Sequence, residues 1–269
     1  MWDTLIIGPF INVLLFIYNL IGQNFGVAII LFTILIRLIT YPLTYKQLKG
    51  TQKMQEINKD KRWIEMQAKY KNDREKLAQE QMKMYKEIGY NPLSGCLPTL
   101  IQFPIIIGLY QAVIRALAST PLELLGLMRF MYKGFLDAGS LIPLNSHFLW
   151  MDLSQPERLN LSFIPFGIPV LAIIVVVTTY LQSKLMQPTS GNPGDQSAMM
   201  GNMMNIYMPF LMGYMAYTLA AGLALYFVVS NVIGILQYAL MGKLNWRNLL
   251  PKPKTDAAGA NKQKAIDSK

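Results

Sequence analysis

The sequence predicts an all-α protein that crosses a membrane several times. Of its 269 residues, 52% are apolar and only 15% are charged. Several apolar runs approach or exceed the roughly 20 residues that an α-helix needs to cross the hydrocarbon core of a bilayer. No Asp or Glu lies within these runs. Together, these observations are typical of a polytopic helical membrane protein.

Five membrane spans are expected, at about residues 23–45, 92–115, 162–186, 203–220 and 222–242. The last two spans are short, and Ala220, Ala221 and Gly222 join them, so a tight membrane hairpin is expected there. Pro98 and Pro104 fall within the second span and predict kinks in its helix.

Residues 1–22 form a separate N-terminal unit in this interpretation. Residues 4–20 are also apolar, but they are few, and Gly8, Pro9 and Asn12 interrupt them. The sequence therefore favours a helix that lies in the membrane interface over a sixth span.

The distribution of charge predicts how the spans are oriented. Segment 46–90 carries 12 basic and 7 acidic residues, and the tail 243–269 carries 7 basic and 2 acidic residues. Segment 116–161 instead carries 3 basic and 4 acidic residues. By the positive-inside rule, segment 46–90 and the C-terminal tail are cytoplasmic, whereas segment 116–161 and the N-terminus lie outside. Five spans place the two termini on opposite sides of the membrane, as these assignments require, whereas six would place them on the same side.

Segment 46–90 has the pattern of a helical hairpin. Apolar stripes are expected in both arms, from Met54, Ile57, Ile64 and Ala68 in the first and from Leu77, Tyr85 and Ile88 in the second. A solvated spacer is the alternative for this segment. The tail 243–269 has the composition of a disordered basic segment, able to contact anionic lipid or ribosomal RNA.

Arg37 is the leading candidate for a functional residue because it lies inside the first span. A guanidinium stays charged in proteins, so it needs water, a counter-ion or the membrane surface. Helical spacing places it in one polar stripe with Thr33, Thr40, Tyr41 and Thr44. This stripe favours a hydrated groove within the bundle over the alternative, an arginine that snorkels to the head groups.

The sequence lacks the motifs of several kinds of catalytic and metal-binding site. The chain has one cysteine, Cys96, and one histidine, His147, in the segment predicted to lie outside. It has no phosphate-binding loop and no His-Glu-x-x-His zinc motif. An enzyme, a metal site or a cofactor is therefore not expected.

Three blocks of sequence are specific enough, taken together, to suggest a family. They are Ile29 to Arg37 followed by Tyr41-Pro-Leu43, Asn91-Pro-Leu-Ser-Gly-Cys-Leu-Pro98 followed by Gln102-Phe-Pro104, and Gly222-Leu-Ala-Leu-Tyr226 followed by Ser230-Asn231 and Gln237. In spacing and order they resemble the YidC family of membrane protein insertases over roughly residues 1–245. The resemblance is to the bacterial form without the large extracytoplasmic domain that many Gram-negative members carry.

The resemblance implies an insertase and chaperone for nascent membrane proteins. Such a protein moves short hydrophilic segments partway through a hydrophilic groove and releases their helices into lipid, alone or with the Sec translocon. Arg37 matches the groove arginine of the family. The resemblance also implies that hairpin 46–90 captures substrates and that the basic tail and hairpin contact ribosomes weakly. The expected location is the bacterial plasma membrane, with a cytoplasmic C-terminus and a monomer as the functional form.

The candidate substrate-binding residues are Arg37, Thr33, Gln102, Tyr226, Ser230, Asn231 and Gln237. For Asn231 and Gln237, an interhelical hydrogen bond is the alternative role. An assembly chaperone or scaffold that packs helices without translocating anything is the alternative function. A small-solute transporter is disfavoured because inverted repeats are not evident in the sequence.

Overall fold

The structure is a computed structural model that describes residues 1–46, 49–50, 60–70, 73–87, 89, 93–117, 120–132, 144–159, 167–186, 196–242, 244 and 246. Side chains are described for these residues except 74, 93–101, 121 and 196–205. Apart from one short antiparallel strand pair, the regular structure in this part of the chain is helical.

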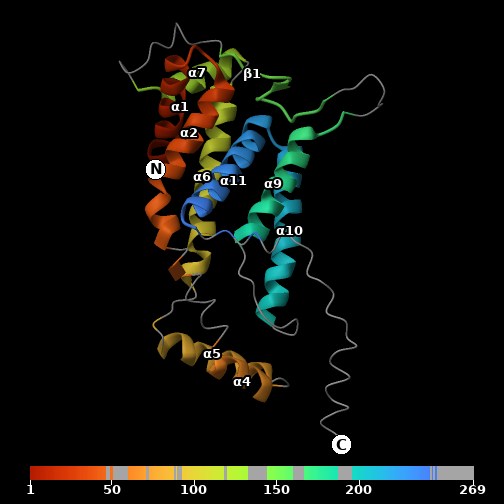
Figure 1. Cartoon of the computed structure of the whole chain (residues 1–269). Helices are drawn as coiled ribbons and strands as arrows, with labels where there is room; N and C mark the ends of the chain where they lie inside the picture. The colour runs from red at the N-terminus through yellow and green to blue at the C-terminus, as the bar shows by residue number, and fades with distance from the viewer. Residues whose placement is uncertain are drawn as a thin grey trace, which may run out of the picture.

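The elements follow one another along the chain as shown in Figure 1. They are η1 (Asp3–Ile7, a π-helix), α1 (Gly8–Leu20), α2 (Phe25–Ile39), α4 (Lys61–Lys69), α5 (Arg74–Glu87), α6 (Leu93–Ala116), α7 (Pro121–Phe130), β1 (His147–Phe148), β2 (Met151–Asp152), α9 (Val170–Met186), α10 (Gln196–Thr218) and α11 (Ala221–Leu240).

The long helices form a bundle. Helix α9 packs on α10 and α11, α11 also packs on α2 and α6, and α1 packs on α2 and α6. Helices α4 and α5 lie at one end of the bundle, and α7 and β1 lie at the other (Figure 1). Five helices of this bundle, α2, α6, α9, α10 and α11, fall within or across the five segments expected to span a membrane.

By length and hydropathy alone, two helical stretches of the described chain are able to cross a membrane, Asp3–Leu20 and Ala221–Leu240. Helices α2 and α9 are apolar but shorter. Helix α6 continues through Pro98 and Pro104 as a single helical element, and the kinks expected at both prolines stay a prediction.

The N-terminal helix is firmly packed. Ile11, Leu14 and Leu15 are fully buried. Asn12, which the sequence suggested as an interruption, lies within α1 and connects it to the end of α7. Its Nδ2 donates to the carbonyl oxygen of Phe130 at 2.7 Å, and its Oδ1 accepts from the Tyr132 amide at 2.9 Å. An interfacial position for this helix stays a prediction.

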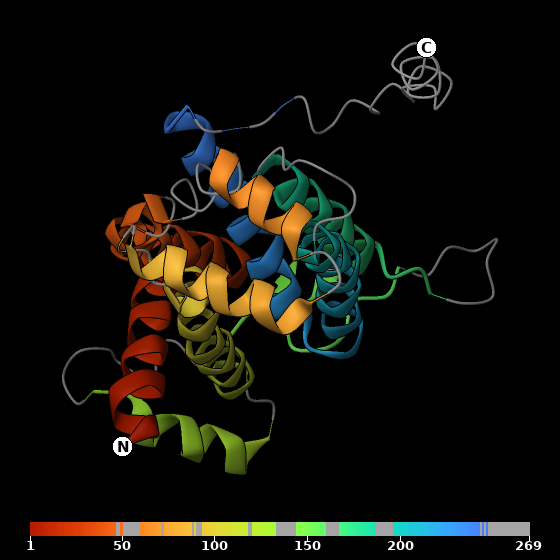
Figure 2. The same cartoon turned by 90° about the horizontal axis from the view of Figure 1, so that it is seen from below.

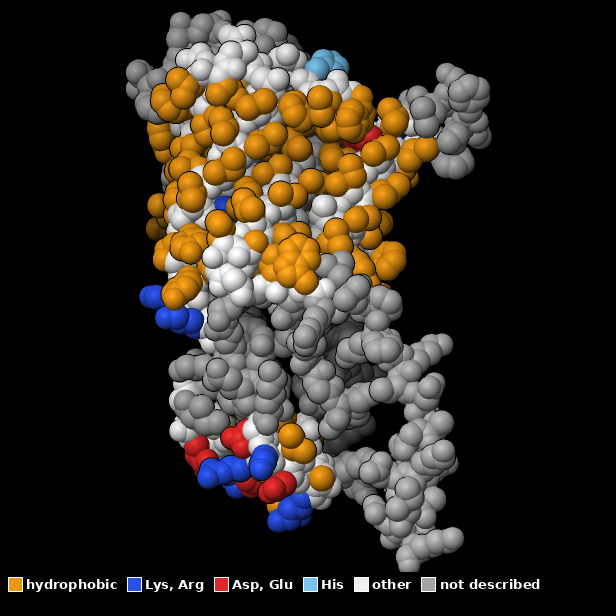
Figure 3. All heavy atoms as spheres, viewed as in Figure 1, with side chains coloured by type: hydrophobic (Ala, Val, Ile, Leu, Met, Phe, Trp, Pro, Cys, Tyr) orange, Lys and Arg blue, Asp and Glu red, His pale blue; other side chains and the backbone are white. Residues whose placement is uncertain are grey.

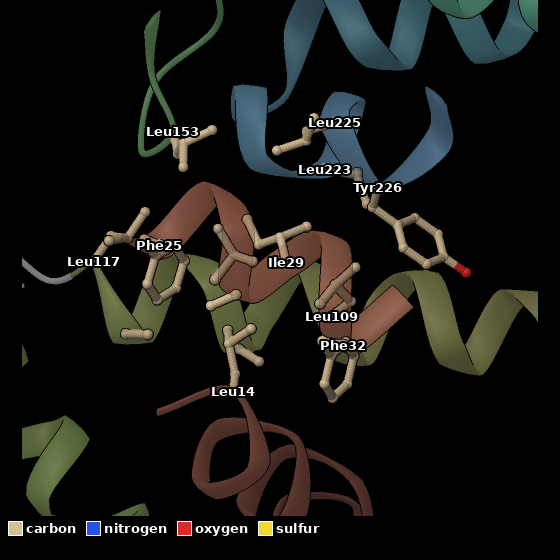
Figure 4. Close-up of a cluster of buried hydrophobic side chains, with 14 of the residues drawn as sticks. Leu14, Phe25, Ile29, Phe32, Leu109, Leu117, Leu153, Leu223, Leu225 and Tyr226 are labelled. Carbon is tan, nitrogen blue, oxygen red and sulfur yellow. The ribbon is translucent and has the colours of Figure 1, made fainter. Parts of the chain in front are cut away.

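The core lies where α1, α2, α6 and α11 meet, and Figure 4 shows its central side chains. Phe25, Ile29 and Phe32 of α2 belong to this core together with Leu14 of α1 and Leu109 of α6, and none of these five is more than 1% exposed. Lipid tails are as apolar as leucine, so the helices of a membrane bundle associate through close fit rather than through the hydrophobic effect.

Helices α10 and α11 are joined by only two residues, which gives the close connection expected around Ala220 to Gly222. Loop 153–159 caps the start of α11. The Ala221 amide donates to Gln155 O at 2.8 Å, and the Gly222 amide donates to Leu153 O at 3.1 Å. These bonds satisfy amides that the first turn of a helix leaves without a partner.

Helices α4 and α5 form the two arms of the expected helical hairpin, with a small apolar cluster of their own. Trp63, Met84 and Tyr85 are buried in it. Ile64, expected in the apolar stripe, is 45% exposed, whereas its neighbour Trp63 is 2% exposed. The buried face of α4 is therefore shifted by one residue, and the large indole fills it. Met54, Ile57 and Ile88 lie outside the described residues.

Replacing Trp63 with alanine is expected to destabilise this hairpin by about 3–5 kcal/mol, because a large buried side chain is lost. Hydrogen exchange at α4 and α5 should then accelerate while exchange at α11 stays unchanged. Trp63→Phe is the matched control. The buried Trp63 Nε1 has no hydrogen-bond partner among the described residues, so phenylalanine keeps most of the apolar contact and leaves no hydrogen bond unmade there. Unchanged protection of α4 and α5 in the alanine variant would contradict the role of Trp63.

Candidate functional site

A pocket of about 310 Å³, lined by both polar and apolar side chains, opens between α2, α6, α9, α10 and α11. Of the side chains of α10 that the structure describes, Met208 and Met212 line its wall. Its polar lining comes from α6, α9, α11, and α2 with the residues that directly follow it: Arg37, Thr40, Thr44, Gln102, Thr179, Gln182, Ser183, Tyr226, Ser230, Asn231 and Tyr238. A cluster of polar groups of this size is uncommon inside a membrane bundle and marks the pocket as the candidate site.

Arg37, in the last turn of α2, is half-buried in this pocket. Its Nε donates a hydrogen bond to Ser230 Oγ at 3.0 Å, and its Nη2 donates to the same oxygen. None of the three ion pairs formed by the described residues includes Arg37. In this part of the chain, the guanidinium therefore has a hydroxyl partner and no carboxylate partner.

Gly234 permits the close approach of α9 and α11 beside Arg37. A Cβ at this position would lie 2.5 Å from Gln182 Nε2 and 3.9 Å from Arg37 Nη2. Because the glycine leaves this space open, the Gln182 amide occupies it and lies near the guanidinium.

Tyr226 joins the apolar core to the pocket. Its ring is almost fully buried, and its hydroxyl points away from Leu223 and Leu225 in Figure 4. Gln102 Nε2 of α6 donates to this hydroxyl at 2.6 Å. The bond holds the hydroxyl at the wall of the pocket and connects α6 to α11.

Asn231 also lines the pocket while it joins two helices. Its Nδ2 donates to Thr178 Oγ1 at 3.1 Å and to Thr179 Oγ1 at 2.8 Å. Gln237 does not line the pocket, and its Nε2 donates to the carbonyl oxygen of Arg37 at 3.3 Å. Asn231 therefore lines the pocket and also makes interhelical hydrogen bonds, and its part in substrate binding stays a prediction. Gln237 makes an interhelical bond.

Thr33 is fully buried outside the pocket lining, where its hydroxyl donates to Ile29 O at 2.7 Å. Of the seven candidate residues, the structure brings Arg37, Gln102, Tyr226, Ser230 and Asn231 together around the pocket. Thr33 and Gln237 lie outside its lining.

Three polar residues of α9 also line the pocket, although sequence reasoning did not select them. They are Thr179, Gln182 and Ser183. Their i, i+3 and i+4 spacing on an otherwise apolar helix was an available signal, of the same kind as the stripe around Arg37. On that stripe, Thr40 and Thr44 line the pocket and Tyr41 does not.

The arrangement is suited to weak binding of a polar or anionic segment. It combines one cation with hydroxyl and amide groups that both donate and accept hydrogen bonds. Among the described residues, no group of His, Cys, Asp and Glu is arranged to hold a metal ion.

Comparisons with known proteins agree on one family. Residues 16–247 match the family model described as 60Kd inner membrane protein. A membrane protein insertase YidC from Syntrophobacter fumaroxidans is 35% identical over 240 residues, covering 88% of this chain and 37% of that protein. One from Oceanobacillus iheyensis is 32% identical over 249 residues, covering 90% of this chain and 84% of that protein.

The fold also resembles a solved structure, the crystal structure of an active YidC insertase with its first transmembrane domain resolved. The TM-score is 0.51 at 28% identity, covering 82% of this chain and 42% of that one. This chain thus spans less than half of the Syntrophobacter relative and of the crystallised insertase, and most of the Oceanobacillus relative. It therefore belongs to the family of 60Kd inner membrane proteins, together with the YidC membrane protein insertases that it resembles.

Proposed function

We propose that this protein is an insertase whose pocket around Arg37 receives short hydrophilic segments of nascent membrane proteins. The observation that carries the proposal is an arginine inside an apolar bundle, with a hydroxyl partner and no carboxylate partner among the described residues. The relatives named as membrane protein insertases support the same function.

The proposed mechanism follows from the cost of moving polar groups across lipid. A polar tail that crosses about 30 Å of hydrocarbon must leave its backbone groups without hydrogen-bond partners. A hydrated groove that reaches partway across shortens this dry path, and Arg37 offers an acidic tail a temporary partner. Water in the groove screens the pairing, so the substrate is not trapped. The substrate helix then partitions into lipid, which drives its release without ATP.

The proposed orientation has five spans, with the N-terminus outside and the C-terminus in the cytoplasm. It rests on the excess of basic residues in segment 46–90 and in the tail. Helices α4 and α5 then lie on the cytoplasmic side, and α7 and β1 on the outer side. A substrate from the cytoplasm would meet the hairpin first and the pocket next.

The proposed location is the bacterial plasma membrane. The proposed partners, besides nascent membrane proteins, are the Sec translocon, anionic lipids and, weakly, the ribosome through the basic tail and hairpin. Because the pocket lies within one chain, a monomer is sufficient for the proposed step.

The test is insertion of a single-span substrate with an acidic N-terminal tail into liposomes that contain only this protein. Wild type, Arg37→Ala and Arg37→Lys are compared, and a substrate with a neutral tail is run beside each. We expect a loss of at least about tenfold with alanine, since about 1.4 kcal/mol of lost pairing corresponds to that factor. Lysine should largely retain insertion, because its ammonium keeps the charge.

Equal insertion of the acidic tail by all three proteins would contradict a role for the Arg37 charge. Failure of wild type to insert either substrate, with the protein folded in the liposomes, would favour the alternative function, an assembly chaperone for membrane helices. The neutral tail separates the two kinds of defect: a misfolded variant fails with both substrates, whereas loss of the charge affects the acidic tail alone.

A further inference from the structure

Helix α7 lies across the end of the bundle rather than along it. It is found at the end opposite α4 and α5 in Figure 1, and in the view along the bundle it runs within the plane of the picture (Figure 2, yellow-green). The helix begins at a capping box, in which the Thr120 hydroxyl accepts from the Glu123 amide and the Glu123 carboxylate accepts from the Thr120 amide. Residues 121–130 are thus a well-formed helix set crosswise to the bundle.

The helix is held rigidly on its inner side. Leu127 is 1% exposed and belongs to the core of the bundle. At its C-terminal end, Asn12 of α1 accepts from the Tyr132 amide and donates to Phe130 O. The Arg115 guanidinium lies 4.6 Å from the centre of the Phe130 ring and pairs with Asp3 at 3.1 Å. These contacts fix both the position and the rotation of α7.

Apart from Arg129, the face that turns away from the bundle is apolar as well. Leu122, Leu125 and Met128 are 79%, 61% and 52% exposed. They follow one another at intervals of three residues and lie on the side of the helix opposite Leu127. A helix that is apolar on both its inner and its outer face is not in a stable position in water.

We propose that this outer face of α7 lies in lipid, at the boundary between acyl chains and head groups. Helix α7 lies at the level of the upper edge of the belt of hydrophobic side chains that Figure 3 shows on the near side of the bundle, and it packs on η1, α1 and α6. Arg129 is exposed on the same side, where its guanidinium can reach a lipid phosphate while its aliphatic part stays in the apolar layer. A crosswise helix with this composition has the character of an interfacial anchor.

The anchor would define where the bundle sits relative to the membrane surface at that end. Since α7 is bound to both α1 and α6, lipid contact at Leu122, Leu125 and Met128 would also set the height of these helices in the bilayer. The inference is independent of the proposed use of Arg37, because it concerns only the outer surface of the bundle.

The test uses a single nitroxide label in proteoliposomes. Cys96 is the only cysteine, so Cys96→Ser provides a background in which Leu122, Leu125 or Met128 is changed to Cys and labelled. Collision rates are measured with oxygen, which concentrates in lipid, and with a water-soluble nickel complex. Phe210 on α10, 67% exposed, provides the lipid reference, and Lys76 on α5 provides the water reference.

We expect all three α7 labels to collide with oxygen more often than the Lys76 label does, and no more often than the Phe210 label. Collisions with nickel should be at least about fivefold less frequent than at the Lys76 label. Nickel access equal to that at Lys76 would overturn the inference, since α7 would then lie in water. Labels shielded from both reagents would overturn it as well, because a protein surface would then cover this face. Labels at low density, diluted with unlabelled protein, exclude contact between copies as the source of shielding.

Discussion

Replacing Gly222 with valine is expected to destabilise the folded bundle by about 1–3 kcal/mol or more, the range for overpacking a well-packed core. Gly222 stands in the first turn of α11, where three parts of the protein approach it. A Cβ at this position would lie 2.9 Å from Val113 Cγ1, 3.2 Å from Ile29 Cδ1 and 3.3 Å from Leu153 O. The carbonyl oxygen of Leu153 cannot move away easily, because it also accepts the hydrogen bond from the Gly222 amide.

The measurement is the midpoint of thermal unfolding of the detergent-solubilised protein, followed by the fraction that remains monodisperse after heating. Gly126→Val on α7 is the matched control. A Cβ at Gly126 meets no atom of the described residues within 4 Å outside its own helix backbone, so valine there meets no such obstacle and should leave the midpoint unchanged or slightly higher. Equal midpoints for Gly222→Val and wild type would show that the junction of α2, α6 and α11 is looser than these distances indicate.

The helical fold could be predicted from the sequence because long apolar runs in a membrane protein leave few alternatives to helices. The expected span 92–115 corresponds to α6 at Leu93–Ala116 within one residue at each end. Helix α9 begins at Val170 although a span was expected from residue 162. The reason lies in Ile168, which pairs with Leu159 in an isolated β-bridge and so keeps the chain extended there.

Segment 116–161, between the second and third expected spans, was predicted only as an outer loop. The structure of its described part depends on tertiary contacts. Helix α7 has an apolar face on both sides, which leaves a weak amphipathic signal in the sequence. The burial of Glu157 and its hydrogen bonds could not be predicted from the sequence. Its carboxylate is buried and accepts from Trp150 Nε1 and from the Leu171 amide, both at 3.0 Å, near the start of α9. Such a partnership depends on residues that are distant until the loop folds.

The candidate site, too, could be predicted from the sequence only in part. The spacing of Arg37, Thr40 and Thr44 identified one wall of the pocket, since all three share a helix face. Thr33 shares that face as well, but its hydroxyl is satisfied by Ile29 O within its own helix and lies outside the pocket. Which polar residues of a stripe reach the pocket depends on how deeply neighbouring helices cover each turn. A single sequence does not contain that information.

Replacing Ser230 with aspartate is expected to abolish most insertion of substrates with acidic tails, although Arg37 stays in place. Ser230 Oγ accepts from Arg37 Nε at 3.0 Å, so a carboxylate at this position lies within ion-pairing reach of the guanidinium. Two unit charges about 4 Å apart attract with about 4 kcal/mol where the effective dielectric constant is about 20. A substrate carboxylate would have to displace this internal partner, so a loss of at least about tenfold in insertion is expected.

The measurement is the same liposome insertion assay with acidic and neutral tails, and Ser230→Asn is the matched control. Asparagine has nearly the size of aspartate and still accepts a hydrogen bond, but it carries no charge. It should therefore retain insertion of the acidic tail. The aspartate variant should keep the thermal stability of wild type and insert the neutral tail normally. If Ser230→Asp inserts the acidic tail as well as Ser230→Asn does, the positive charge in the pocket is not what the substrate uses.

The Ser230→Asp variant separates two explanations for a loss of insertion that Arg37→Ala alone cannot distinguish. Removing the arginine deletes its charge, its hydrogen bonds to Ser230 and much of its volume, so α2 and α11 could move together and close the pocket. The aspartate leaves the arginine and its contact to α11 in place and neutralises only the charge. Agreement between the two variants would mean that the charge without a carboxylate partner, and not the shape of the pocket alone, receives the acidic tail. If only Arg37→Ala loses activity, Arg37 acts by holding α2 and α11 apart.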